Sequence, residues 1–152
     1  MGDNPRVYVP PPLLALAVLA AGLAIDGRLA APPDGPILLK VGAGALIVSG
    51  ILPIAIALGL FRRRKTRPEP WAPSSALVVE GIYRFTRNPM YLGMMLVYAG
   101  LALLFQSLTA FLLLAPLAVI FDRLVIAREE AYLARRFGAA YASYRAQVRR
   151  WL

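Results

Sequence analysis

The longest uncharged stretch of the sequence most restricts how this chain can fold. No charged residue occurs among the 34 residues from 88 to 121. As one α-helix this stretch would be about 51 Å long, which is far more than the roughly 30 Å hydrocarbon core of a bilayer. It therefore fits a helical hairpin of two membrane spans, residues 89–105 and 108–126, with Gln106-Ser107 as the expected turn.

Two further uncharged runs precede the hairpin. They cover residues 7–25 and 41–61 and contain 19 and 21 residues, enough for one span each. With 59% hydrophobic residues, the 152-residue chain carries more apolar surface than a soluble domain of this size could bury. We therefore predict an all-α polytopic membrane protein with about four transmembrane helices, divided into an N-terminal two-span region (1–65) and a region containing the hairpin (66–152).

The basic residues predict the orientation of these spans. Seven Lys and Arg residues fall between 62 and 87 and seven between 123 and 150, whereas the opposite segments hold only Arg28 and Lys40. Because basic residues remain on the cytoplasmic side, both termini are expected to be cytoplasmic. The net charge of +9 is explained by this asymmetry, so nucleic acid is not expected as a partner.

An aromatic stripe runs through the C-terminal segment. Its members recur at spacings of four and three, which places them on one face of an amphipathic cytoplasmic helix; they are Phe137, Tyr141, Tyr144, Val148 and Trp151. The helix could lie in the membrane interface, anchored by its aromatic residues. It could instead cover a site formed where the spans leave the membrane.

Composition also limits the possible chemistry. The chain contains no cysteine and no histidine. This excludes thiolate chemistry and removes both the commonest metal ligand and the side chain that titrates near neutrality. No metal site is expected.

One polar cluster lies at the start of the hairpin. Asn88-Pro89 is typical of an N-cap followed by the first helical residue. The positive end of that helix could hold a cofactor carboxylate, with Arg87 adding charge beside it. Alternatively the pair only starts the helix, and Arg84 and Arg87 are cytoplasmic anchors.

A second cluster follows the hairpin. Asp122, Glu129 and Glu130 are carboxylates close to hydrocarbon, where an acidic group is costly unless it is paired, hydrated or functional. S-adenosylmethionine, which carries an ammonium and a sulfonium, could compensate them, with nearby tyrosines adding cation–π contacts. Ion pairs with Arg123, Arg87 or Arg135 are the structural alternative.

Together the two clusters form a recognisable pair of motifs. The pattern L-V-x-x-G-x-Y-x-x-x-R-N-P-x-Y begins at Leu77, and E-E-x-x-L-x-x-x-F-G-x-x-Y-x-x-Y begins at Glu129. This pair resembles the isoprenylcysteine carboxyl methyltransferase and phospholipid methyltransferase superfamily of membrane enzymes. The resemblance covers about residues 75–151.

The resemblance implies a cytosolic pocket for S-adenosylmethionine, which the acceptor enters from the bilayer. By similarity the residues lining that pocket are Leu77, Val78, Tyr83, Asn88, Pro89, Met90, Tyr91, Glu129 and Glu130. The candidate catalytic residues are Arg87, Arg123 and Glu129.

Two positions depart from the pattern of the carboxyl methyltransferases. Asn88 stands where these enzymes typically have histidine, and its side chain can hydrogen-bond but cannot titrate near neutrality. Val125 stands where members acting on prenylcysteine place a substrate-binding arginine, although Arg123 and Arg128 are nearby.

The sequence thus predicts an integral membrane, S-adenosylmethionine-dependent methyltransferase whose partners are membrane lipids and a lipophilic acceptor, lipid-like or prenylated. Carboxylate O-methylation is favoured over N-methylation because a carboxylate is already nucleophilic, whereas an amine must first lose a proton to a group such as Tyr83 or a glutamate. The alternatives are an NADPH-binding enzyme resembling sterol reductases and a non-enzymatic membrane subunit.

Overall fold

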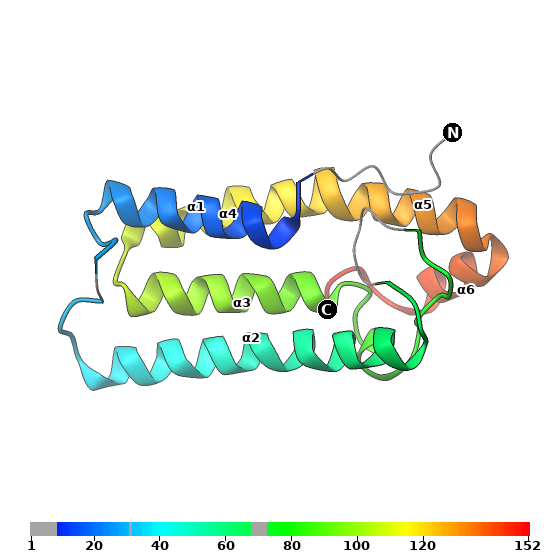
Figure 1. Ribbon diagram of the computed structural model, residues 1–152, viewed down its shortest axis with the longest axis horizontal. Coiled ribbons are helices and arrows are strands. Elements are labelled where there is room, and N and C mark those ends of the chain that lie inside the picture. Colours follow the sequence, from blue (N-terminus) through cyan, green and yellow to red (C-terminus); the bar gives the residue numbers. More distant parts are fainter. Residues whose placement is uncertain (1–8, 31, 68–72) are drawn as a thin grey trace.

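The computed structural model describes residues 9–30, 32–67 and 73–152. Every regular element in these ranges is helical, which confirms the predicted all-α class (Figure 1). In chain order the elements are α1 (Pro11–Ile25), α2 (Ile37–Arg63), η1 (Gly81–Arg84), α3 (Pro89–Leu104), α4 (Leu108–Ile120), η2 (Phe121–Ile126), α5 (Ala127–Phe137) and α6 (Ala139–Gln147).

Two helical segments are long and apolar enough to cross a membrane. They are α2, with 27 residues, and the continuous segment Leu108–Phe137, with 30 residues. The apolar helices α1 and α3 are shorter, with 15 and 16 residues. Residues 7 and 8 of the first predicted span lie outside the described residues. Two of the four predicted spans therefore meet the length and composition of a membrane-crossing helix. The other two remain a prediction.

Helix α3 lies between α2 and the α1–α4 pair (Figure 1). Glycines let α2 and α3 approach closely, because a Cβ added at Gly50 would lie 2.5 Å from the Gly93 carbonyl oxygen, and one added at Gly93 would lie 2.5 Å from the Gly50 oxygen. Such backbone contact between small residues is a common way for helices to pack in membranes. It leaves no room for a ligand between the two helices at this level.

The hairpin turns at the expected place, between α3 and α4. Gln106 has a positive φ of 49°, and the Ser107 side chain caps α4 by accepting a hydrogen bond from the Ala110 amide at 3.1 Å. Asp26, directly after α1, accepts hydrogen bonds from Ser107 Oγ at 2.7 Å and from Thr109 Oγ1 at 2.6 Å. These bonds fasten α1 to the hairpin at one end of the bundle.

A π-helical turn, η2, joins α4 to α5 without interrupting the helix. Phe121, Val125 and Ile126 of this turn are buried in the main hydrophobic core. A π-helical turn takes up one more residue than an α-helical turn. In a regular α-helix the seven-residue spacing would place Asp122 nearly above Glu129, and the π-helical turn alters that register.

The C-terminal segment is not one continuous helix, so this part of the prediction was wrong. Gly138 has a positive φ of 50° and separates α5 from α6. Helix α6 ends at Gln147, and Val148 is extended, with φ −121° and ψ 131°. The aromatic stripe is therefore divided between two short helices and the extended chain that follows them.

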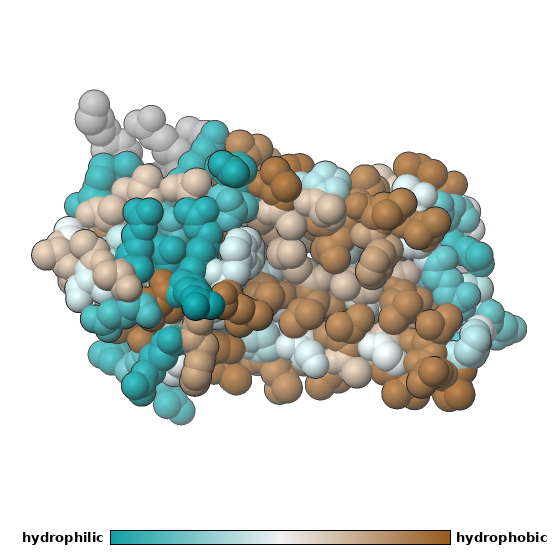
Figure 2. All heavy atoms as spheres, turned by 180° about the vertical axis from the view of Figure 1, so that it is seen from behind, coloured by the Kyte–Doolittle hydropathy of each residue, from teal (hydrophilic) through white to brown (hydrophobic). Residues whose placement is uncertain are grey.

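The surface has two distinct parts. On the face seen in Figure 2, apolar side chains cover the middle of the bundle, the larger group of hydrophilic side chains lies at the end that holds α5 and α6, and a smaller group lies at the opposite end. Large exposed apolar residues occur on α1, α2 and α4, among them Leu16, Val48, Ile51 and Leu112. Lipid contact explains such a surface, since water would disfavour it. The chain is an integral membrane protein.

Candidate functional site

A cavity of about 560 Å³ lies at the hydrophilic end of the bundle. Its walls come from the start of α1, the end of α2, the segment 74–88, the start of α3, and helices α5 and α6. The volume is within the roughly 300–1,000 Å³ of sites that hold small molecules. The cavity is therefore the candidate site.

The cavity brings the two motifs of the sequence together. Nearly all of the residues predicted to form the cofactor pocket line it, together with Arg87; they are Leu77, Val78, Tyr83, Asn88, Met90, Tyr91, Glu129 and Glu130. The hairpin explains this, because α3 leaves the hydrophilic end and the continuous α4–η2–α5 segment returns to it.

Three positions of interest do not line the cavity. Pro89 is fully buried as the first residue of α3. Arg123 points away: its side chain is 78% exposed, and its Nε lies 3.5 Å from Asp122. Val125 is part of the main core, so the position at which prenylcysteine-directed members carry arginine is a packing position here.

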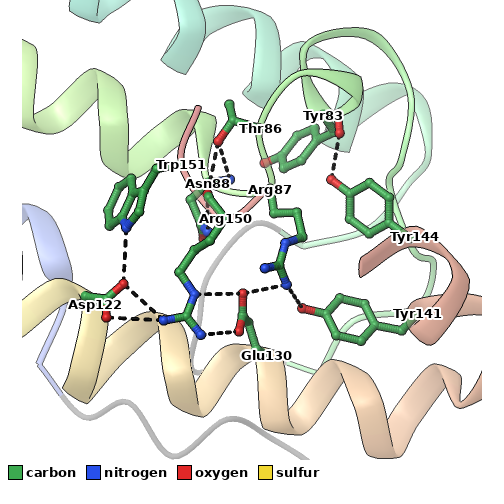
Figure 3. A network of polar contacts seen from close by, with 10 residues as sticks. All are labelled: Tyr83, Thr86, Arg87, Asn88, Asp122, Glu130, Tyr141, Tyr144, Arg150 and Trp151. Atoms are coloured by element: carbon green, nitrogen blue, oxygen red, sulfur yellow. Dashed lines mark hydrogen bonds and ion pairs between the residues drawn. The ribbon is translucent and has the colours of Figure 1, made fainter. Parts of the chain in front are cut away.

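A balanced ion network forms one side of the site (Figure 3). Glu130 pairs with Arg87 at 2.8 Å and with Arg150 at 2.6 Å. Arg150 also pairs with Asp122 at 3.1 Å. Both carboxylates therefore have guanidinium partners: Glu130 is shared by Arg87 and Arg150, and Asp122 by Arg150 and the exposed Arg123.

Glu129 differs from Glu130. It lines the cavity and accepts a hydrogen bond from the Tyr91 hydroxyl. Within the described ranges no arginine or lysine pairs with it. A carboxylate in this position is compensated when a cation occupies the cavity.

Arg87 offers a free donor at the same site. Its Nη1 contacts Glu130, and lies 3.4 Å from the Tyr141 hydroxyl. Its Nε is buried and has no hydrogen-bond partner among the described residues. Because buried donors are nearly always satisfied, this atom indicates a place for an acceptor oxygen from a ligand or water.

Tyrosines complete the wall beside α6. The Tyr144 hydroxyl donates to the Tyr83 carbonyl at 2.7 Å, and both rings line the cavity. Burial raises the pKa of Tyr83 and that of Tyr144 above the usual value of 10.0. Both phenols therefore stay protonated, which disfavours Tyr83 as the proton acceptor suggested by the sequence. Because Tyr141 and Tyr144 face the cavity, α6 covers the site, as the second interpretation of the aromatic stripe expected.

Sequence reasoning missed several lining residues. Ile54, Leu58 and Phe61 come from α2, and Arg67, Ser74 and Tyr132 from the loop and α5. The α2 residues carry no motif and resemble the rest of an apolar span. Tyr132 accepts a hydrogen bond from the Ser74 amide at 3.0 Å, a contact between distant segments that no local pattern could reveal.

Comparisons with known proteins agree with the motifs. A family model, phospholipid methyltransferase, matches residues 40–140. The chain is 36% identical to the protein-S-isoprenylcysteine O-methyltransferase of Schizosaccharomyces pombe over 72 residues, 47% of this chain and 30% of that enzyme. It is also 36% identical to an uncharacterised protein of Haemophilus influenzae over 63 residues, 41% of this chain and all of that protein.

The extent of these matches limits what they show. The chain spans 30% of the length of the Schizosaccharomyces pombe enzyme, and no solved structure matches it. The family model, however, covers well over half of the 152 residues and includes Asn88, Glu129 and Glu130 of the cavity. The chain therefore belongs to the phospholipid methyltransferase family.

Proposed function

We propose that this protein is a membrane methyltransferase that binds S-adenosylmethionine in the cavity between α3 and α5. The observation that carries the proposal is Glu129. Its carboxylate lines the cavity without a cation among the described residues, while the neighbouring ion network is already balanced. A ligand with an ammonium and a sulfonium group supplies the missing charge.

The residues of the cavity suit such a ligand in several ways. Glu129 would hold the ammonium, and the faces of Tyr83 and Tyr144 would lie against positive charge. The free Nε of Arg87 would donate to the ligand's carboxylate. When bound, S-adenosylmethionine supplies a methyl group on a positively charged sulfur.

The remaining tasks of the protein are alignment and exclusion of water. An in-line displacement gains mainly from holding the reacting atoms in position and from a dry site. The apolar side chains of Ile54, Leu58 and Phe61 would keep water out on the α2 side. Tyr91 holds the Glu129 carboxylate in place through its hydrogen bond.

We also propose a lipid-like acceptor with a carboxylate as the methylated group. Apolar residues of α1, α2 and α3 line the cavity, namely Pro11, Leu58 and Met94. An apolar tail could remain there at the level of the lipid. A carboxylate needs no base, and the raised pKa of Tyr83 and that of Tyr144 leave these hydroxyls unsuited to deprotonating an amine.

The orientation is part of the proposal. The cavity lies at the end of the bundle where the basic segments 62–67 and 123–150 gather, so it would face the cytoplasm with both termini. The chain has no cysteine, so a single thiol can report the sidedness. An impermeant thiol reagent applied to intact cells should label Asp34→Cys and spare Arg63→Cys, and the reverse result would overturn the orientation.

Two measurements test the function. Radiolabelled S-adenosylmethionine should bind the detergent-purified protein at equilibrium, and NADPH should not compete. The labelled methyl group should then appear in extracted membrane lipid. Preferential NADPH binding would instead favour a reductase, binding of neither ligand would favour a non-enzymatic subunit, and label confined to soluble metabolites would refute the lipid-like acceptor.

A further inference from the structure

The last residues of the described chain form a strap, residues 149–151, that returns to the start of α3 (Figure 1). The Arg149 carbonyl accepts a hydrogen bond from the Arg87 amide at 3.0 Å. The Arg150 carbonyl accepts two more, from Thr86 Oγ1 at 3.1 Å and from Asn88 Nδ2 at 2.9 Å. The strap is thus bonded to the segment that leads into the cavity wall.

The side chain of Arg150 reaches the opposite wall (Figure 3). Its Nη2 and Nε donate to the two oxygens of Glu130 at 2.6 and 3.2 Å. Its Nη1 donates to both oxygens of Asp122 at 3.1 and 3.2 Å. The indole of Trp151 adds a hydrogen bond to Asp122 at 3.1 Å. Arg150 therefore joins η2, α5 and the start of α3.

We infer that Arg150 is a positioning residue of the cofactor pocket, an inference that rests on the proposed function. Arg150 does not itself line the cavity, but Asn88 and Glu130 do. Its carbonyl accepts a hydrogen bond from Asn88 Nδ2, which restrains the orientation of that side chain. Its guanidinium engages both oxygens of Glu130, and a planar fork of this kind fixes a carboxylate in orientation as well as in position.

The same geometry affects Arg87. Arg87 shares Glu130 with Arg150, and the two guanidinium groups hold the carboxylate from two sides. Arg150 engages both oxygens of Asp122 and both oxygens of Glu130. The Nε of Arg87, a residue that lines the cavity, has no hydrogen-bond partner among the described residues. Loss of Arg150 would free Glu130 to turn toward Arg87 and would disturb the donor proposed for the ligand.

The test is the dissociation constant of S-adenosylmethionine in purified, folded variants. Arg150→Gln should weaken binding roughly tenfold, as expected when hydrogen bonds to charged groups are lost. Arg150→Lys keeps the charge but not the fork, and should recover part of the affinity. Arg149→Gln is the matched control, because Arg149 is exposed and contributes through its main chain; its binding should equal that of the wild type.

A second variant separates positioning from simple stabilisation. Asp122→Asn should weaken binding about threefold in the wild-type background and add no further loss to Arg150→Gln, because the two residues act as one unit. A purely stabilising role would lower the melting temperature of these variants and leave the dissociation constant of the folded protein unchanged. That result would overturn the inference, as would an equal loss in Arg149→Gln.

The outcomes also separate this inference from the proposed function. If the wild type fails to bind S-adenosylmethionine, the proposed function itself is refuted. If the wild type binds and the Arg150 variants bind equally well, only the positioning role is refuted. Should Arg150→Gln not fold, Arg150→Lys and Asp122→Asn decide the question by the same criteria.

Discussion

Asp26 and Glu129 lie at opposite ends of the bundle and differ in how many hydrogen bonds their carboxylates accept. Asp26, beside the α3–α4 turn, accepts hydrogen bonds from Ser107 Oγ and from both the amide and the hydroxyl of Thr109. Glu129, at the other end, accepts one from Tyr91 and faces a cavity. The Asp26 carboxylate is satisfied by the protein and holds α1 to the turn, whereas the Glu129 carboxylate is left facing the cavity in which we propose a ligand.

The same contrast extends to how each end is held together. Between the ends, α2 and α3 meet through backbone contact at Gly50 and Gly93. At the hydrophilic end the helices are joined by ion pairs around Glu130 and Arg150. Tight apolar packing leaves no space for a ligand, while a charged framework can surround one.

The largest effect is expected from Glu129→Gln. Without the negative charge, binding of S-adenosylmethionine should weaken by about 1.5–3 kcal/mol, roughly 10–150-fold. The melting temperature should stay the same or rise, because a half-buried carboxylate without a cation among the described residues is removed. Equilibrium binding and thermal unfolding in detergent measure the two quantities.

Glu80→Gln is the matched control for this variant. Glu80 is an exposed carboxylate paired with Arg64 at 2.6 Å, outside the cavity. If Glu129→Gln binds S-adenosylmethionine as tightly as the wild type, or if Glu80→Gln loses as much affinity, then the Glu129 carboxylate does not hold the ligand.

Gly93→Ala should give the next largest effect, on stability. The added Cβ would lie 2.5 Å from the Gly50 oxygen, so the two helices must separate, at a cost of about 1–3 kcal/mol. Gly44→Ala is the control, since a Cβ there meets nothing within 4 Å and alanine favours the helix. Equal thermal stability of the two variants would contradict close packing of α2 on α3.

Ser107→Ala should cost about 1 kcal/mol of stability, the usual value of an N-cap. It removes the acceptor for the Ala110 amide and a donor to Asp26. Binding of S-adenosylmethionine should be unchanged, because the turn lies at the opposite end of the bundle from the cavity. A weakened dissociation constant in this variant would show that the two ends are coupled.

The smallest effect concerns pH. Hydrogen bonds from Thr109 and Ser107 hold the pKa of Asp26 below its usual value of 3.8. The ionised form is therefore favoured by folding, so its contribution is fully present above pH 3.8 and is lost as the pH falls through the lower, folded value. Thermal unfolding from pH 6 to pH 3 should show Asp26→Asn less stable than the wild type at pH 6, with the difference shrinking at the acid end. A difference independent of pH would exclude this role of the charge.

Part of this architecture could be predicted because it depends on short-range patterns. Uncharged runs predicted the apolar helices, and the limit on span length placed the turn at Gln106-Ser107. The motifs around Asn88 and Glu129 predicted opposite walls of one cavity, since a hairpin of this length returns both to the same end.

The remainder depends on contacts that no local pattern contains. Arg150 is 62 residues from Asn88 and 28 from Asp122, and nothing near it in the sequence marks those partners. The aromatic stripe assumed that an α-helix continues through Gly138, where the chain adopts a positive φ of 50° that suits glycine. The π-helical turn could not be predicted either. Hydropathy shows how long an apolar run is, but not whether its turns are α-helical or π-helical.

That turn has a consequence for how the chain length can vary. A π-helical turn holds one more residue than an α-helical turn, so deleting one residue from Phe121–Ile126 would let η2 close as ordinary α-helix and leave the helix beyond it facing nearly the same way. The core half of the helix and the acidic pair Glu129 and Glu130 would both keep their directions. The chain can thus lose one residue at this turn without turning the acidic pair away from the cavity, whereas a deletion from regular α-helix would rotate the residues beyond it by about 100°.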